Sequence, residues 1–234
     1  MKSSLWLVIL SGILPALIIV AYILIRDRKN PEPVKMLLKG FGYGILAVPL
    51  DIALISLISN IFPLTFNTAS AFGAIAESFI NAAIPEEAIK ILLLWLLLRK
   101  NSYFNEHMDG IVYAVCVGMG FAATENVLYL FSNIDNWQVV AIGRAFLAIP
   151  GHYIFAVVMG YFYALAYFLP QHRYCWAMAY LLPVLLHGMY DSFLMLTSNG
   201  LLQGGVSVLL FLICFIYSIR HTNKLIRKQL MKDC

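Results

Sequence analysis

Seven long apolar segments divide the chain, and they limit its possible folds more than any other feature of the sequence. They cover roughly residues 4–25, 37–62, 70–98, 110–132, 138–169, 176–197 and 203–220. Each approaches or exceeds the roughly 20 apolar residues that a helix needs to cross a bilayer. A helix also satisfies its backbone hydrogen bonds within a single segment, as lipid requires. The sequence therefore predicts an all-α, polytopic membrane helix bundle of about seven transmembrane helices, with residues 1–234 forming a single transmembrane domain.

The composition excludes an ordinary soluble domain. The chain is 62% hydrophobic and 12% charged, whereas soluble domains carry about 25% charged residues. The lipid bilayer is therefore the expected surrounding. A net charge of +4 does not indicate a nucleic-acid partner, and none is expected. The four cysteines are scattered without CxxC spacing, so the sequence predicts neither a disulfide framework nor a zinc ribbon.

The connectors between the segments alternate in charge. Those after the first, third and fifth segments, and the tail after the seventh, carry Lys or Arg, and the others carry none. The positive-inside rule then predicts an outside N-terminus and a cytoplasmic C-terminus, with residues 221–234 as a basic cytoplasmic tail. The first segment is too long for a signal-peptide core and is expected to be a retained span. Segments 70–98 and 138–169 are long enough to be tilted or broken, with kinks expected at Pro85 and Pro150.

Ionisable side chains interrupt the apolar segments, although each costs about 2.5–3.5 kcal/mol at the centre of a membrane helix. The set comprises Asp51, Glu77, Glu86, Glu87, Glu125, His152, His187 and Asp191. Groups at this depth face the interior of a bundle and mark a functional site by default. Asp51 and Glu77 are instead expected to be interfacial or structural, and Arg144 is expected to snorkel from the end of a span.

Helical spacing predicts that several of these groups converge. The pairs four residues apart, on one helix face, are Glu86–Lys90, Phe121–Glu125 and His187–Asp191. Glu87 lies about 100° further round its helix, and Asn126 adds a neutral donor beside Glu125. Three or four helices thus each carry a small polar cluster, which predicts one site inside the bundle.

Carboxylates with imidazoles provide a general base and a general acid, the groups needed to hydrolyse an amide with activated water. The sequence has no GxSxG or HExxH motif and no GxGD-type pair of aspartates. The same residue types also suit a divalent metal ion with a glutamate as base. Spacing does not separate metal-dependent from metal-free hydrolysis, so both remain open.

Four stretches together resemble the PrsW family of bacterial intramembrane proteases. They are "PEEAIK" (85–90), "DGIVYAVCVGMGFAATENVLY" (109–129), "GHYIFAVVMGYFYALA" (151–166) and "HGMYDSFL" (187–194). The resemblance places the catalytic helices within residues 80–195 and implies a multi-pass protein of the bacterial inner (cytoplasmic) membrane. It implies site-1 type cleavage of a membrane-anchored anti-sigma factor, so the expected partner is a membrane-anchored protein substrate.

The catalytic candidates are Glu86, Glu87, Glu125, His152, His187 and Asp191, with Lys90 and Asn126 in support. Glu86 is expected to be the general base on a water molecule, with Lys90 tuning the glutamate pair. His187, oriented by Asp191, is expected to stabilise the oxyanion. Glu87, Glu125 or His152 would orient the water or hold a metal. The cofactor is thus either none or a divalent ion such as Zn²⁺, with ligands drawn from Glu86, Glu125, His152, His187 and Asp191.

A more distant similarity links the chain to the glutamate-type CAAX endopeptidases. The matching residues are Glu86, Glu87, Phe121, His187 and Asp191. Glu125 stands where that family has a histidine, and His152 is expected to take its part. The alternatives are therefore a CAAX-type processing protease, an ion-coupled transporter, or a non-catalytic polytopic membrane protein. A transporter often shows inverted repeats, and none is visible here.

Overall fold

The structure, a computed structural model, describes residues 5–62, 65–202 and 205–232, and within these ranges all regular structure is helical. The elements are α1 (Leu5–Arg26), α2 (Val34–Ile61), α3 (Ala71–Ala76), the π-helix η1 (Glu77–Ala83), α4 (Ile84–Leu98), α5 (His107–Ser132), the 3₁₀ turn η2 (Ile134–Asn136), α6 (Trp137–Phe146), α7 (Ala148–Phe168), α8 (Tyr174–Ser198) and α9 (Gly205–Lys232).

The predicted all-α membrane bundle is confirmed. Within the described ranges, five helical stretches are long and apolar enough to cross a membrane: Leu5–Arg26, Val34–Ile61, His107–Ser132, Ile134–Phe168 and Tyr174–Ser198. The third expected span corresponds to the uninterrupted helical run of α3, η1 and α4. The seventh corresponds to α9, although its expected first two residues, 203–204, lie outside the described residues.

Both segments expected to be broken change direction or pitch. In the first, the π-helix η1 ends just before Pro85, and the amide of Ile84 donates to the carbonyl of Phe79, five residues back. Proline has no N–H, so a regular α-helical bond cannot continue through it. In the second, the break lies at Leu147 (φ −117°, ψ −60°) and not at Pro150. Pro150 sits in the first turn of α7, where a missing N–H has no intrahelical partner to lose.

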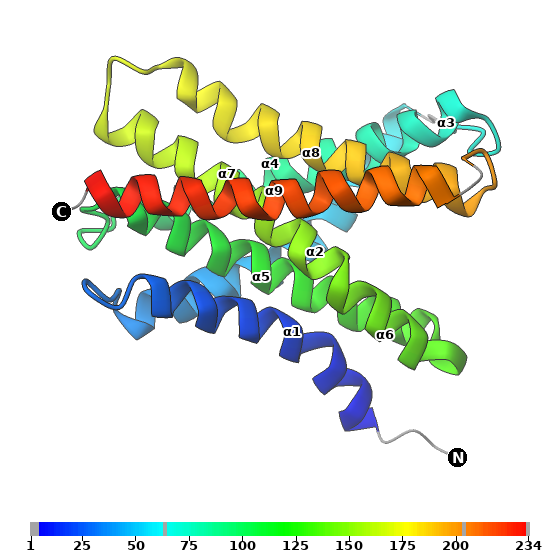
Figure 1. Ribbon diagram of the computed structural model, residues 1–234, viewed down its shortest axis with the longest axis horizontal. Coiled ribbons are helices and arrows are strands. Elements are labelled where there is room, and N and C mark those ends of the chain that lie inside the picture. Colours follow the sequence, from blue (N-terminus) through cyan, green and yellow to red (C-terminus); the bar gives the residue numbers. More distant parts are fainter. Residues whose placement is uncertain (1–4, 63–64, 203–204, 233–234) are drawn as a thin grey trace.

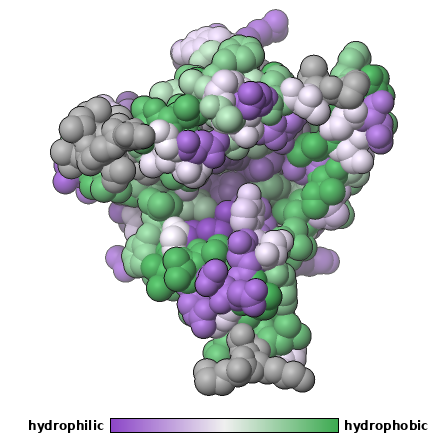
Figure 2. All heavy atoms as spheres, turned by 90° about the vertical axis from the view of Figure 1, so that its right-hand side faces the viewer, coloured by the Kyte–Doolittle hydropathy of each residue, from purple (hydrophilic) through white to green (hydrophobic). Residues whose placement is uncertain are grey.

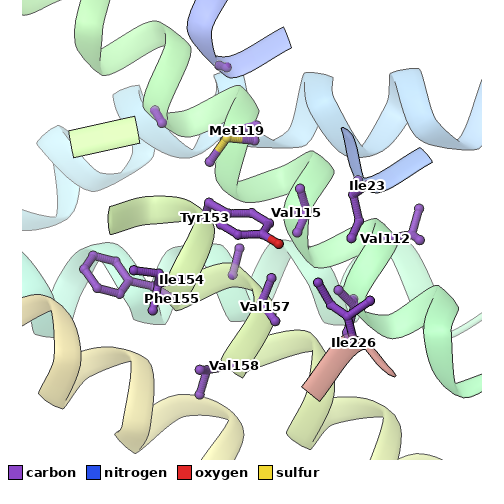
Figure 3. Packing of buried hydrophobic residues seen from close by; sticks show 14 of the residues in the cluster. Ile23, Val112, Val115, Met119, Tyr153, Ile154, Phe155, Val157, Val158 and Ile226 are labelled. Atoms are coloured by element: carbon purple, nitrogen blue, oxygen red, sulfur yellow. The ribbon is translucent and has the colours of Figure 1, made fainter. Parts of the chain in front are cut away.

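Helix α5 forms the centre of the bundle and packs against α1, α2 and α7 (Figure 1). It begins with a capping box, in which Glu106 and Asp109 each accept from the other's backbone amide. Its side chains Val112, Val115 and Met119 meet Tyr153 of α7 in a buried cluster that also includes Ile23 of α1 and Ile226 of α9 (Figure 3). Few of its residues are exposed, so polar groups on α5 lie inside the protein and not in lipid.

Glycine pairs bring α5 into backbone contact with two neighbours. Gly120 lies against Gly44 and Phe41 of α2, and a Cβ there would overlap the carbonyl oxygen of Phe41. Gly110 of α5 faces Gly160 of α7 in the same way, and a Cβ at Gly160 would overlap the carbonyl oxygen of Gly110. Small residues at such crossings let membrane helices approach closely. These contacts fix the helices that carry the polar groups described next.

Candidate active site

The first turns of α4 carry a buried ion-pair cluster. The Lys90 ammonium donates to Glu86 Oε2 at 3.1 Å and to Glu87 Oε1 at 2.8 Å. Glu87 and Lys90 are almost fully buried, and Glu86 is 9% exposed. The helical spacing of four and three residues produces this arrangement directly. The predicted convergence of these three groups is thus present in the structure.

His187, on α8, contacts carboxylates of both α4 and α8. His187 Nδ1 lies 2.9 Å from Glu87 Oε1, and Nε2 lies 3.1 Å from Asp191 Oδ2. The same Nε2 is 3.9 Å from Glu86 Oε2. Phe155 of α7 stacks on the ring with centroids 4.9 Å apart. Both ring nitrogens therefore face carboxylates, and the ring plane is held by an aromatic neighbour.

The remaining predicted residues come from α5 and α7. His152 Nε2 lies 2.9 Å from Glu125 Oε2, and its Nδ1 lies 3.4 Å from the Lys90 ammonium. The ring of Phe121, one turn before Glu125, lies beneath the same ammonium at 3.9 Å from its centroid. All six catalytic candidates thus belong to one network that spans α4, α5, α7 and α8, as the sequence predicted.

Arg144 belongs to this network, and the expectation that it snorkels from a span end is wrong. Its Nη2 donates to Glu125 Oε2 at 2.6 Å, and its Nε donates to Asn126 Oδ1 at 2.6 Å. The Asn126 amide in turn donates to the carbonyl of Gly12 in α1 at 3.3 Å. The chain reverses at residues 133–136, and α6 therefore returns alongside α5. No spacing rule in the sequence gives the rotation of α6 that turns Arg144 toward Glu125. Glu125 within an apolar segment was the available clue, since a carboxylate shielded from water needs a cation.

A pocket of about 650 Å³ lies beside the network. The predicted residues that line it are Glu86, Glu125, His152, His187 and Asp191, whereas Glu87, Lys90 and Asn126 lie behind them. Arg144 and Glu77 also line it. Glu77 was expected to be interfacial or structural, and here it accepts from the Asn81 amide at 2.9 Å on the pocket wall. Asp51 is buried on α2 and is not part of this wall.

The pocket lies toward the end of the bundle that carries α3 and the start of α6. Its wall includes Gly143 of α6 and Ser198, the last residue of α8. Figure 2 looks onto this end, and hydrophilic side chains gather there in a recess between apolar rims. The polar network is therefore reached from one end of the molecule.

One triad of this network has metal-ligand geometry. Ligand atoms of Glu86, Glu87 and His152 all lie within 4.8 Å of one another. However, the Lys90 ammonium lies 3.1, 2.8 and 3.4 Å from these same three side chains. A divalent ion placed about 3 Å from an ammonium is repelled by about 11 kcal/mol at an effective dielectric constant of about 20. The triad therefore does not fit a divalent metal ion while Lys90 keeps this position.

Comparisons with known proteins agree with the site. The family described as "PrsW family intramembrane metalloprotease" matches residues 32–218. A protein named Protease PrsW from Clostridioides difficile (strain 630) is 37% identical over 201 residues, covering 84% of this chain and 81% of the relative. A protein of the same name from Geobacillus kaustophilus (strain HTA426) is 34% identical, covering 77% of this chain and 76% of the relative. Another, from Bacillus subtilis (strain 168), is 32% identical and covers 82% of this chain and 84% of the relative. No solved structure matches the chain. The chain belongs to the PrsW family and is an intramembrane protease.

Proposed function

We propose that Glu86 is the general base that activates water for hydrolysis of a substrate peptide bond. The observation that carries this assignment is the position of the two adjacent glutamates. Glu86 lines the pocket, whereas Glu87 lies behind it, 1% exposed and bound to Lys90 and His187. A general base must reach the water that it deprotonates. Glu86 meets this requirement, and Glu87 serves to position its neighbours.

His187 is the candidate for stabilising the oxyanion of the tetrahedral intermediate. Its Nε2 faces the pocket side of the network, 3.9 Å from Glu86 Oε2, and Asp191 holds it at 3.1 Å. A donor this close to the base can reach the carbonyl oxygen of a bond attacked by the activated water. Asp191 and Glu87 orient the ring from its two nitrogens.

Glu125 and His152 form the opposite wall, and we assign them the orientation of the water. Both line the pocket, and they lie 2.9 Å apart. Lys90 balances the charge of Glu86 and Glu87 from behind, and Asn126 positions Arg144. Residues 80–195 contain all of these groups and are proposed as the catalytic helices.

The pocket is proposed to open on the outer side of a bacterial cytoplasmic membrane. The basic connectors 26–35, 99–108 and 170–175 and residues 221–232 of the tail lie at the end of the bundle where the C-terminus is marked (Figure 1). The pocket lies toward the opposite end. The positive-inside rule assigns the basic end to the cytoplasm, and this gives an outside N-terminus and a cytoplasmic C-terminus.

The proposed substrate is a membrane-anchored protein that is cut near the outer end of its span. Catalysis at an outward-facing pocket suits a first, site-1 type cleavage, and an anti-sigma factor is the substrate that family membership suggests. A pocket of about 650 Å³ falls within the size range of ligand sites in proteins. It can receive a short unwound segment of chain, whose carbonyl groups are free of helical hydrogen bonds.

The test uses single-span reporters with a different tag at each end. One reporter set varies the residues at the outer end of the span, and the matched set varies those at the cytoplasmic end. Co-expression with this chain is expected to cut only the outer set, as resolved by the sizes of the tagged fragments. Cutting confined to the cytoplasmic set would refute the proposed direction of access.

Arg144→Lys is expected to lower the rate of cleavage by roughly tenfold to 100-fold while the protein remains folded. A guanidinium donates to Glu125 and Asn126 at once, whereas a single ammonium cannot match this fork. Glu125 then shifts relative to His152, and misplacement of about 1 Å can cost about 100-fold in rate. Cleavage kinetics at saturating reporter measure the effect. Arg173→Lys, in a connector at the other end of the bundle, is the matched control, and equal rates for both variants would contradict this role.

A further inference from the structure

The Lys90 ammonium stands at the point where a metal ion would bind. The three side chains with metal-ligand geometry, Glu86, Glu87 and His152, all direct a polar atom toward its Nζ. An ammonium and a divalent ion compete for the same carboxylate oxygens and for the same lone pair of the imidazole. Binding of an ion here would require Lys90 to leave all three partners.

Lys90 has little room to leave. The ring of Phe121 lies 3.9 Å from its ammonium on one side. A void of about 10 Å³ adjoins it, lined by Glu87, Lys90 and His152 among others. This is about the space of a single water molecule. It does not accommodate a displaced ammonium together with an ion and the ion's remaining ligands.

The void also accounts for an oxygen that would otherwise point toward a metal. Glu87 Oε2 is buried and has no hydrogen-bond partner among the described residues. Glu87 lines the void, and a water molecule there would lie beside its carboxylate and could donate to it. The unsatisfied oxygen therefore calls for a water molecule and does not require a cation beyond Lys90.

We propose that Lys90 supplies the positive charge of this site in place of a metal ion, and that it excludes divalent ions from Glu86, Glu87 and His152. This inference differs from the metalloprotease description attached to the family. It deepens the proposed function, because it makes activation of water at Glu86 independent of metal. In this arrangement Lys90 is a positioning residue, since it acts through the two glutamates and the histidine.

The test measures bound metal directly. The full-length protein in detergent is equilibrated with Zn²⁺, separated from free ion, and analysed by elemental mass spectrometry. The wild-type protein is expected to retain far less than one ion per chain, and its cleavage of reporter is expected to survive strong chelators. Lys90→Met, which keeps an unbranched side chain, shortens it by one atom and removes its charge, is expected to retain about one ion per chain. The double variant Lys90→Met/His152→Ala is expected to lose that ion again.

Three results would overturn the proposal. One is a wild-type protein that holds one Zn²⁺ per chain and loses it in the His152→Ala variant. The second is inactivation of the wild type by a chelator with recovery on adding Zn²⁺. The third is a folded Lys90→Met protein that takes up no ion. The wild-type measurement stands even if Lys90→Met does not fold. Metal content does not depend on activity, so failure of Glu86 as the base would leave this test intact.

Discussion

Replacing Glu86 with Gln is expected to lower the rate of peptide hydrolysis by roughly 100-fold to 10,000-fold, the usual contribution of a general base. Glutamine keeps the size of the side chain and can still accept from Lys90, but it cannot take a proton from water. Single-turnover cleavage of a reporter in reconstituted vesicles measures the effect. The rate is expected to fall with little change in substrate affinity, because the base acts in the transition state.

Two variants make this expectation decisive. Asp135→Asn makes the same change of carboxylate to amide at an exposed position on the α5–α6 connection, and it is expected to cleave at the wild-type rate. Glu87→Gln tests the neighbouring residue. If Glu86→Gln cleaves at the wild-type rate while Glu87→Gln does not, the general base is Glu87. The assignment of the base from which glutamate lines the pocket would then be wrong.

Gly120→Ala is expected to destabilise the protein by about 3 kcal/mol, near the upper end for overpacking of a core. The added Cβ would overlap the carbonyl oxygen of Phe41, which is backbone and cannot rotate away. Helix α2 must then separate from α5, which carries Phe121 and Glu125 into the site. Thermal unfolding in detergent measures the loss, and cleavage activity is expected to fall with it.

The matched control makes the same substitution on the lipid-facing side of α2. A Cβ at Gly42 meets nothing within 4 Å, so Gly42→Ala is expected to stabilise the helix by about 0.5–1 kcal/mol. Equal stabilities for the Gly120→Ala and Gly42→Ala proteins would show that close contact between α2 and α5 does not limit the fold.

The sequence predicted those parts of the architecture that depend on local pattern. Apolar segments of bilayer length predicted the helices, and a spacing of four residues predicted the Glu86–Lys90 and His187–Asp191 contacts. Family membership is confirmed by the comparisons. The catalytic roles stay predictions, because proximity in the structure does not measure a rate.

The sequence did not predict the features that depend on tertiary contacts. Arg144 reaches Glu125 across 19 residues because the chain reverses at residues 133–136, and no periodicity gives the rotation of α6 that turns Arg144 toward Glu125. The sequence also did not predict that Glu86 lines the pocket and Glu87 does not, since adjacent residues differ mainly by a rotation of about 100° around the helix. Which of the two faces the pocket depends on how α4 is rotated against α7 and α8.

The π-helix η1 determines which side chains of the helical run from η1 into α4 face the pocket. Nine residues separate Glu77 from Glu86, and in a continuous α-helix that interval ends about half a turn away, on the opposite face. The wider turn of η1 reduces this offset, and Glu77, Asn81 and Glu86 all line the same pocket. These three side chains form a polar track along the wall. If the proposed substrate enters this pocket, water and its unwound backbone would meet hydrogen-bonding groups at each turn of the helical run up to Glu86.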